Sequence, residues 1–130
     1  MRKLFVVMLT AAAAAFVVIG VGAAGGQGTA HSAKTTLSLK ASASGALKFN
    51  KKKLSAGRGK VTIVMTNPSS SGLKHGIAVE GKGVDKDGAI VKPGVKSTLI
   101  VRLKKTGKYE FYCPVDGHKS AGMKGTLTIH

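Results

Sequence analysis

The amino-acid sequence predicts an all-β domain built as a β-sandwich. Apolar and polar residues alternate in short runs, as they do in strands that bury one face. Turn-forming Gly, Pro, Asn, Asp and Ser separate these runs, which recur at intervals of roughly 8 to 12 residues. Since no run has the period of an amphipathic helix, we expect about seven short strands in two packed sheets.

Two short strand signals open the domain. Residues 36–40 alternate Leu with Ser and Lys, and residues 46–49 form a second apolar run. Three consecutive lysines follow at residues 51–53, which we interpret as a solvated turn or a sheet edge.

A stronger strand signal comes after a turn. Residues 54–60 contain Ser and two Gly and predict a reversal of the chain. Residues 61–66 then read as a strand, with Val61, Ile63 and Met65 on one face. We therefore expect Met65 to be a core residue.

The rest of the chain is predicted to alternate loops and strands. Residues 67–72 are expected to form a surface loop, and residues 81–95 are predicted to be rich in loops. Residues 85–88 read as a tight turn, because they lack the further ligands of a calcium loop. Three more strands are predicted, at residues 99–103, 109–113 and 125–129.

Residues 1–30 have the composition of an export signal or a membrane anchor. Two basic residues precede an uncharged run over residues 4–30, the order that is typical of a secretory signal. The apolar part of this run is also long enough to span a bilayer, which takes about 20 residues. We expect an exported protein that is periplasmic, extracellular or anchored outside the cytoplasmic membrane, with one domain over residues 35–130.

The chain is strongly cationic. It has 21 Lys and Arg residues against 5 Asp and Glu, and its formal net charge is +16. The lysines are scattered and few aromatic residues accompany them, which argues against a nucleic-acid groove. We expect a monomer that meets a partner protein with an acidic docking surface, an anionic membrane surface or a cell-wall polymer.

The single cysteine of the chain points to metal chemistry. An exported protein with one cysteine cannot form an internal disulfide, and an exposed thiol would invite oxidation. Tyr109, Phe111 and Cys113 alternate with Glu110 and Tyr112, so a strand would place the thiol on a buried face beside two aromatic rings. A bound metal explains the retention of such a thiol.

The residues after Cys113 supply further metal ligands. Pro114 and the pair 116–117 cannot continue the strand, so the chain turns back and brings His118 and Met123 near the thiol. With a second histidine from elsewhere, the set becomes two imidazoles, one thiolate and one thioether. This is the ligand set of a blue copper electron-transfer site.

These residues resemble the C-terminal signature of the cupredoxins, in particular plastocyanin-like and auracyanin-like proteins. The signature is Cys113-x4-His118-x4-Met123, preceded by an aromatic strand and followed by Gly-Thr-Leu-Thr-Ile. The resemblance covers roughly residues 35–130 and implies a Greek-key sandwich with one copper ion per chain, cycling between Cu+ and Cu2+. The remaining ligand in that family follows a hydrophobic strand that ends in Asn, which points to His75.

The resemblance also implies a role for each ligand. Cys113 would bind as the thiolate, His75 and His118 as neutral imidazoles, and Met123 as a weak axial ligand. His118 would be the ligand at the solvent edge. The sequence departs from the family at Gly76, where an Asn usually ties the ligand loops together, so this tie is either looser or replaced by another residue such as Asn67.

The function implied is the transfer of single electrons between redox partners. The alternative is a copper storage or delivery protein that uses the same ligands. Zinc is a less suitable metal, because its structural sites favour two or more Cys and thioether is a poor ligand for it. We expect no enzyme activity, since four ligands leave no open position for a substrate.

Overall fold

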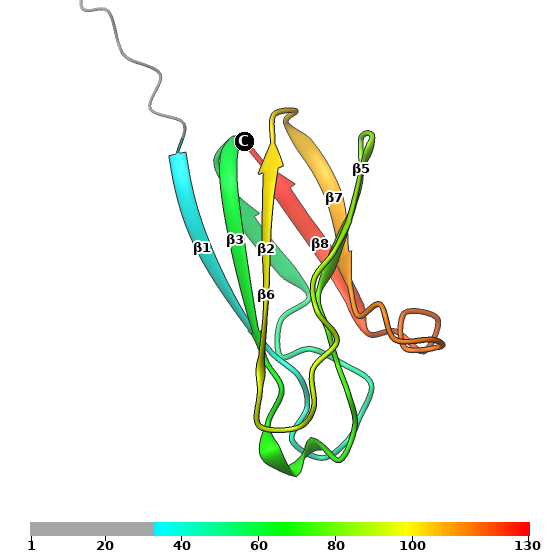
Figure 1. Cartoon of the computed structure of the whole chain (residues 1–130). Coiled ribbons are helices and arrows are strands. Elements are labelled where there is room, and N and C mark those ends of the chain that lie inside the picture. The colour runs from blue at the N-terminus through cyan, green and yellow to red at the C-terminus, as the bar shows by residue number, and fades with distance from the viewer. Residues whose placement is uncertain (1–32) are drawn as a thin grey trace, which may run out of the picture.

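The computed structural model describes residues 33–130, and the predicted signal or anchor over residues 1–30 lies outside them. Within the described range the chain forms eight strands and one short 3-10 helix (Figure 1). No helix in this part of the chain is long and apolar enough to cross a membrane. The elements in chain order are β1 (Ala33–Lys40), β2 (Lys53–Ala56), β3 (Gly59–Thr66), η1 (Ser69–Ser71), β4 (Ala78–Gly81), β5 (Val84–Asp87), β6 (Lys96–Leu103), β7 (Gly107–Tyr112) and β8 (Lys124–Ile129).

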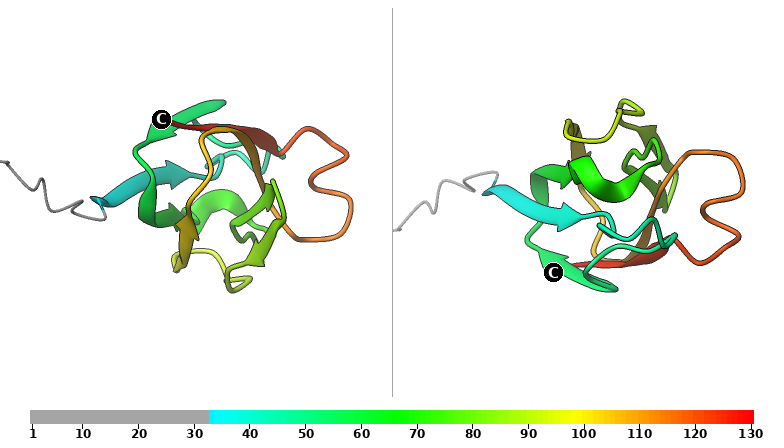
Figure 2. Two further views of the ribbon diagram at one scale, coloured as in Figure 1. Left: turned by 90° about the horizontal axis from the view of Figure 1, so that it is seen from above. Right: turned by 90° about the horizontal axis from the view of Figure 1, so that it is seen from below.

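The strands form two sheets that pack against each other (Figures 1 and 2). One sheet has three strands in the order β1-β3-β6, and the other has five in the order β2-β8-β7-β4-β5. The pairs β1/β3 and β2/β8 are parallel and the others are antiparallel. Parallel neighbours need long connections, and the chain accordingly crosses between the sheets several times. This confirms the predicted all-β sandwich.

The alternating apolar residues of the long strands make the core. Every second residue of β3 and of β6 is buried, and these two strands pair with each other. Met65 is fully buried, as predicted. The Phe111 ring of β7 is also fully buried, and its centroid lies 5.8 Å from that of Phe49. Burying one such side chain stabilises the fold by about 1.5–3 kcal/mol, so a slip of one residue in β3 would be costly.

The sequence-based prediction was wrong for the start of residues 54–60, which belongs to a strand. β2 lies parallel to β8, with Leu54 and Ala56 buried and Lys53 and Ser55 exposed. Two apolar residues in a four-residue strand do not distinguish it from a turn, and the pairing with β8 decides its conformation. The reversal into β3 occupies only residues 57 and 58.

The tight turn predicted at residues 85–88 was also wrong. Residues 84–87 form β5, the edge strand of the five-stranded sheet, which pairs with β4. The chain reverses earlier, around Lys82, whose φ of 51° is positive like those of the glycines on either side. Most of β5 is exposed, so its sequence has no alternating pattern, and the edge of β4 fixes it as a strand.

Candidate metal centre

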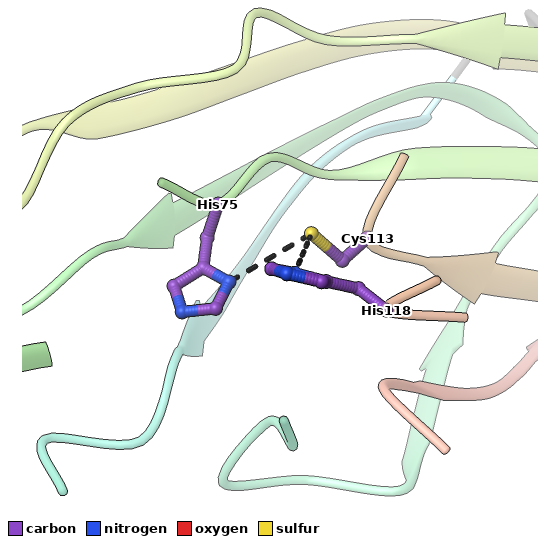
Figure 3. Close-up of side chains that lie close together, drawn as sticks. All are labelled: His75, Cys113 and His118. Atoms are coloured by element: carbon purple, nitrogen blue, oxygen red, sulfur yellow. Dashed lines mark hydrogen bonds between the residues drawn. The ribbon is translucent and has the colours of Figure 1, made fainter. Parts of the chain in front are cut away.

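Three metal-binding side chains from distant parts of the sequence meet at one point (Figure 3). His75 precedes β4, Cys113 directly follows β7, and His118 lies in the loop from β7 to β8. The Cys113 Sγ atom lies 3.8 Å from Nδ1 of His75 and 3.5 Å from Nδ1 of His118. Their donor atoms all lie within 4.8 Å of one another, and no other group of this kind occurs within residues 33–130. The structure therefore brings together three of the four ligands expected from the sequence.

The spacing of these donors fits a first-row transition metal. Bonds of about 2.0 Å to imidazole nitrogen and about 2.3 Å to thiolate sulfur, as at zinc, would separate the two atoms by about 3.7 Å in a trigonal arrangement. The observed separations are 3.8 and 3.5 Å. Two imidazoles with one thiolate suit copper, whereas structural zinc sites favour more thiolates. The residues present thus fit a copper ion.

Cys113 is held in a position shielded from water. Tyr109 and Phe111 are buried on the same face of β7, as predicted, and the thiol is itself fully buried. The N–H group of Gly76 donates a hydrogen bond to the sulfur at 3.4 Å. Burial raises the pKa of the Cys113 thiol, and hydrogen bonds from the backbone of Gly76 and Val115 offset part of that rise. A bound cation would favour the thiolate in these surroundings.

His75 lies inside the protein and presents Nδ1 to the thiol (Figure 3). The backbone N–H group of His75 donates to the Val91 carbonyl at 3.1 Å, and the backbone N–H group of Val91 donates to the His75 carbonyl at 2.8 Å. The pKa of His75 is lowered, mainly by burial and to a smaller extent by the charge of His118. Its Nε2 is the one buried side-chain nitrogen or oxygen without a hydrogen-bond partner in the described range. These surroundings favour the neutral ring, which is the form in which an imidazole binds a metal.

His118 and Met123 belong to a tightly hydrogen-bonded loop, drawn in orange in Figure 2, that projects from the sandwich. The Met123 N–H group donates to the His118 carbonyl, and the Cys113 N–H group donates to the Met123 carbonyl, both at 3.0 Å. Gly122 takes a φ of 101°, which favours glycine. His118 is half-buried and Met123 is fully buried. The backbone of Met123 thus bonds to both Cys113 and His118. Its thioether as a fourth ligand stays a prediction.

The same loop is anchored by a cluster of ion pairs, which the sequence did not reveal. The Lys119 ammonium contacts Glu80 of β4, lies 2.9 Å from Glu110 of β7 and stands 4.2 Å from the centre of the Tyr112 ring. Hydrogen bonds to Glu110 and Glu80 raise the pKa of Lys119. Alternation along β7 already placed Glu110 and Tyr112 on one face. Only the pairing of β4 with β7, however, puts Glu80 opposite Glu110.

Solved structures of copper proteins share this fold. Auracyanin B has 23% sequence identity and a TM-score of 0.65, over 74% of this chain and 88% of that one. A reduced auracyanin from the photosynthetic bacterium Roseiflexus castenholzii has 20% identity and a TM-score of 0.65, over 74% and 97% of the two chains. The copper nitrite reductase of Nitrosomonas europaea has 19% identity and a TM-score of 0.63, over 75% of this chain and 41% of its own.

A family model gives a more specific result than these structures, whose low identities show the fold alone. The model described as copper binding proteins of the plastocyanin/azurin family matches residues 35–130. Comparison with curated protein sequences gives no match. The match spans both sheets and all the candidate ligands, and the donor set fits the metal. The chain therefore belongs to the plastocyanin/azurin family of copper-binding proteins, the cupredoxins, and its cofactor is one copper ion per chain.

Proposed function

We propose that this protein carries single electrons between redox partners through a mononuclear copper centre bound by His75, Cys113, His118 and Met123. The observation that carries the proposal is the convergence of three donor atoms within 4.8 Å around a fully buried thiol. Two histidines, one cysteine and a weak thioether are the ligands of blue copper electron-transfer sites.

The protein contributes donors that its own hydrogen bonds hold in place. The two backbone hydrogen bonds with Val91 hold His75, and β7 together with the Gly76 N–H group holds Cys113. Copper, when bound, supplies a one-electron couple that thiolate and imidazole ligands both accommodate. Because the sandwich supports the donors, little in the protein needs to move when the electron arrives, and the exchange is expected to be fast.

We assign contact with the redox partners to the side of His118. This ligand is half-buried, whereas His75, Cys113 and Met123 are fully buried. Its neighbours in the loop, Pro114 among them, are also only partly buried. A partner can therefore approach the centre through this rim while water stays away from the thiol.

The charge and the N-terminal composition support the proposed setting. A net charge of +16 favours encounters with acidic docking surfaces or with an anionic membrane surface or cell-wall polymer. Two basic residues followed by an apolar run support export, with the first 30 residues either cleaved or kept as an anchor. We propose a monomer outside the cytoplasmic membrane.

Copper storage or delivery is the alternative function, because it would use the same ligands. Electron transfer requires copper to be retained in both oxidation states, whereas delivery requires its release on reduction. We do not propose catalysis, since four ligands leave no open position for a substrate. The likeness to the nitrite reductase covers only 41% of that enzyme's chain.

Addition of cupric ion to the purified protein tests the proposal. We expect an intense visible absorption at one copper ion per chain, and a reversible one-electron titration during which the copper content stays constant. Transfer of the ion to a chelator on reduction would favour delivery. A colourless complex would contradict the blue copper assignment.

Replacement of the Cys113 thiol gives the most direct test of the copper ligands. Cys113→Ser is expected to abolish the visible thiolate-to-copper absorption, because a hydroxyl cannot replace the soft sulfur donor. Absorption spectra at equal copper content compare the variant with the wild type. An unchanged spectrum would end the assignment of Cys113 as a ligand.

Replacement of the thioether tests the fourth ligand. Met123→Leu is expected to retain copper and to shift the reduction potential upward, because the axial ligand tunes the potential without carrying most of the binding. Potentiometric titration measures the shift, with Met65→Leu in the core as a matched control. An equal potential in Met123→Leu and the wild type would remove Met123 from the ligand set.

A further inference from the structure

We propose that Asn67 is a positioning residue for the copper centre, because its side chain fixes the carbonyl that holds the backbone of His75. The inference rests on the proposed function, in which His75 is a copper ligand. Asn67 directly follows β3 and is fully buried. A buried amide needs partners for all its polar atoms, and these partners show what it holds together.

Every polar group of Asn67 is hydrogen-bonded. Its Nδ2 atom donates to the Leu73 carbonyl at 2.8 Å and to the Val91 carbonyl at 3.1 Å. Its Oδ1 atom accepts a hydrogen bond from the Ser71 hydroxyl at 2.6 Å. Its backbone N–H and carbonyl groups bond to residues 95 and 94, at 3.0 and 2.8 Å. The amide therefore has one satisfied orientation, in which it ties residues 71–73 to residues 91–95.

Val91 connects this amide to His75. The Val91 carbonyl accepts from both Asn67 Nδ2 and the His75 N–H group, each at 3.1 Å. The contact between His75 and Val91 is an isolated bridge outside the named strands. Such a bridge lacks the support of a ladder, and Asn67 supplies that support by holding the same carbonyl. By binding Leu73 as well, it fixes the chain just before the histidine.

The residue next to His75 cannot take over this task. A Cβ atom at Gly76 would lie 3.1 Å from the Ala89 carbonyl oxygen and 3.1 Å from Cγ of Pro114. Both distances are shorter than ordinary van der Waals contacts, and a longer side chain would press on the residue that follows Cys113. Gly76 therefore serves the thiol only through its backbone N–H group. Of the two alternatives raised by the sequence, these contacts favour bracing by Asn67 over a looser arrangement.

The variant Asn67→Asp tests the proposal, because it keeps the shape and the acceptor oxygen while a carboxylate cannot donate to Leu73 or Val91. In the copper-free protein, amide hydrogen exchange at His75 is expected to be about ten-fold faster, the factor that corresponds to one hydrogen bond. In the loaded protein, competition with a chelator should reveal a loss of copper affinity of about 10- to 100-fold, the usual range for a residue that orients a ligand.

Ser71→Ala is the second variant. It removes the hydroxyl that orients the amide but leaves both donations of Asn67 in place. A smaller change in the same direction is expected, and this variant decides the matter if Asn67→Asp does not fold. Asn50→Asp is the matched control. Within the described part of the chain, the side chain of this other asparagine bonds only to the Lys40 N–H group, at 2.8 Å. It should match the wild type in both measurements.

Wild-type exchange at His75 and wild-type copper affinity in the variants would overturn the proposal. An equal increase in the hydrogen-exchange rate at a core amide, such as that of Val101, would also overturn it. The variant would then have lost stability throughout the domain and not at His75 in particular. A wild-type protein without a blue centre would contradict the proposed function, whereas exchange at His75 in the copper-free protein tests the action of Asn67 by itself.

Discussion

The two histidines of the candidate copper centre have opposite surroundings. His75 is fully buried, and uncharged hydrogen bonds through Val91 and Asn67 hold its backbone. His118 is half-buried, and its neighbour Lys119 fastens the loop to two carboxylates on the outer face of a sheet. Buried hydrogen bonds are little affected by salt, whereas ion pairs at the surface are screened by it. Buried hydrogen bonds thus hold one histidine, and ion pairs at the surface hold the loop of the other.

This difference matches what each side of the centre has to do. The side of His75 and Cys113 must stay dry, since water would compete for the metal and expose the thiol to oxidation. Buried hydrogen-bonding groups can hold this side of the centre, because no partner protein needs to reach His75 or Cys113. The proposed electron transfer requires the side of His118 to stay accessible, and contacts at the surface hold that side. Substitutions on the two sides should therefore differ in size and in their response to salt.

The largest difference is expected for removal of each imidazole from the copper-free protein. His75→Ala should lower the free energy of unfolding by about 1–3 kcal/mol, because it leaves a cavity in a packed interior. His118→Ala should lower it by less than about 1 kcal/mol, because solvent can fill the space. Urea unfolding of the two variants and the wild type measures both values. Equal losses would contradict the contrast in burial.

A smaller effect is expected from pH on the buried side. The pKa of His75 is lowered from an ordinary value of 6.5. The unfolded chain therefore binds this proton at a higher pH than the folded chain, and stability rises with pH in that interval. As pH falls below about 6.5, the copper-free protein should lose stability, by at most about 1.4 kcal/mol per pH unit from this group.

The variant His75→Gln isolates the contribution of this imidazole, because the other titratable groups remain. Urea unfolding at a series of pH values should show that the difference in stability between the wild type and the variant shrinks below about pH 6.5. A difference that stays constant over this range would show that His75 takes up its proton equally in both states.

The ligands were easier to predict from the sequence than the contacts that hold them. Cys113 and His118 lie close together in the chain, and alternation along one strand already placed the thiol on a buried face. His75 required the family resemblance, because its nearest strand begins only at residue 78. β2 and β5 depend on partner strands that are distant in the sequence, as do the contacts of Lys119. No local pattern encodes such pairings, so they became visible only in three dimensions.

The smallest effect is expected at the surface anchor, where salt distinguishes the two sides of the centre. Lys119→Met keeps an apolar stem near the Tyr112 ring and removes the charge that meets Glu80 and Glu110. The Lys119 side chain is 36% exposed, so the loss at low salt should stay below about 1 kcal/mol. It should become smaller near 1 M salt, where the screening length is about 3 Å. Lys124→Met is the control, since that ammonium lies 3.9 Å from Glu110 and should matter less. Asn67→Asp, measured by urea unfolding under the same conditions, should keep its full loss of stability at high salt. A salt-independent loss in Lys119→Met would mean that packing of the stem, and not charge, fastens the loop of His118.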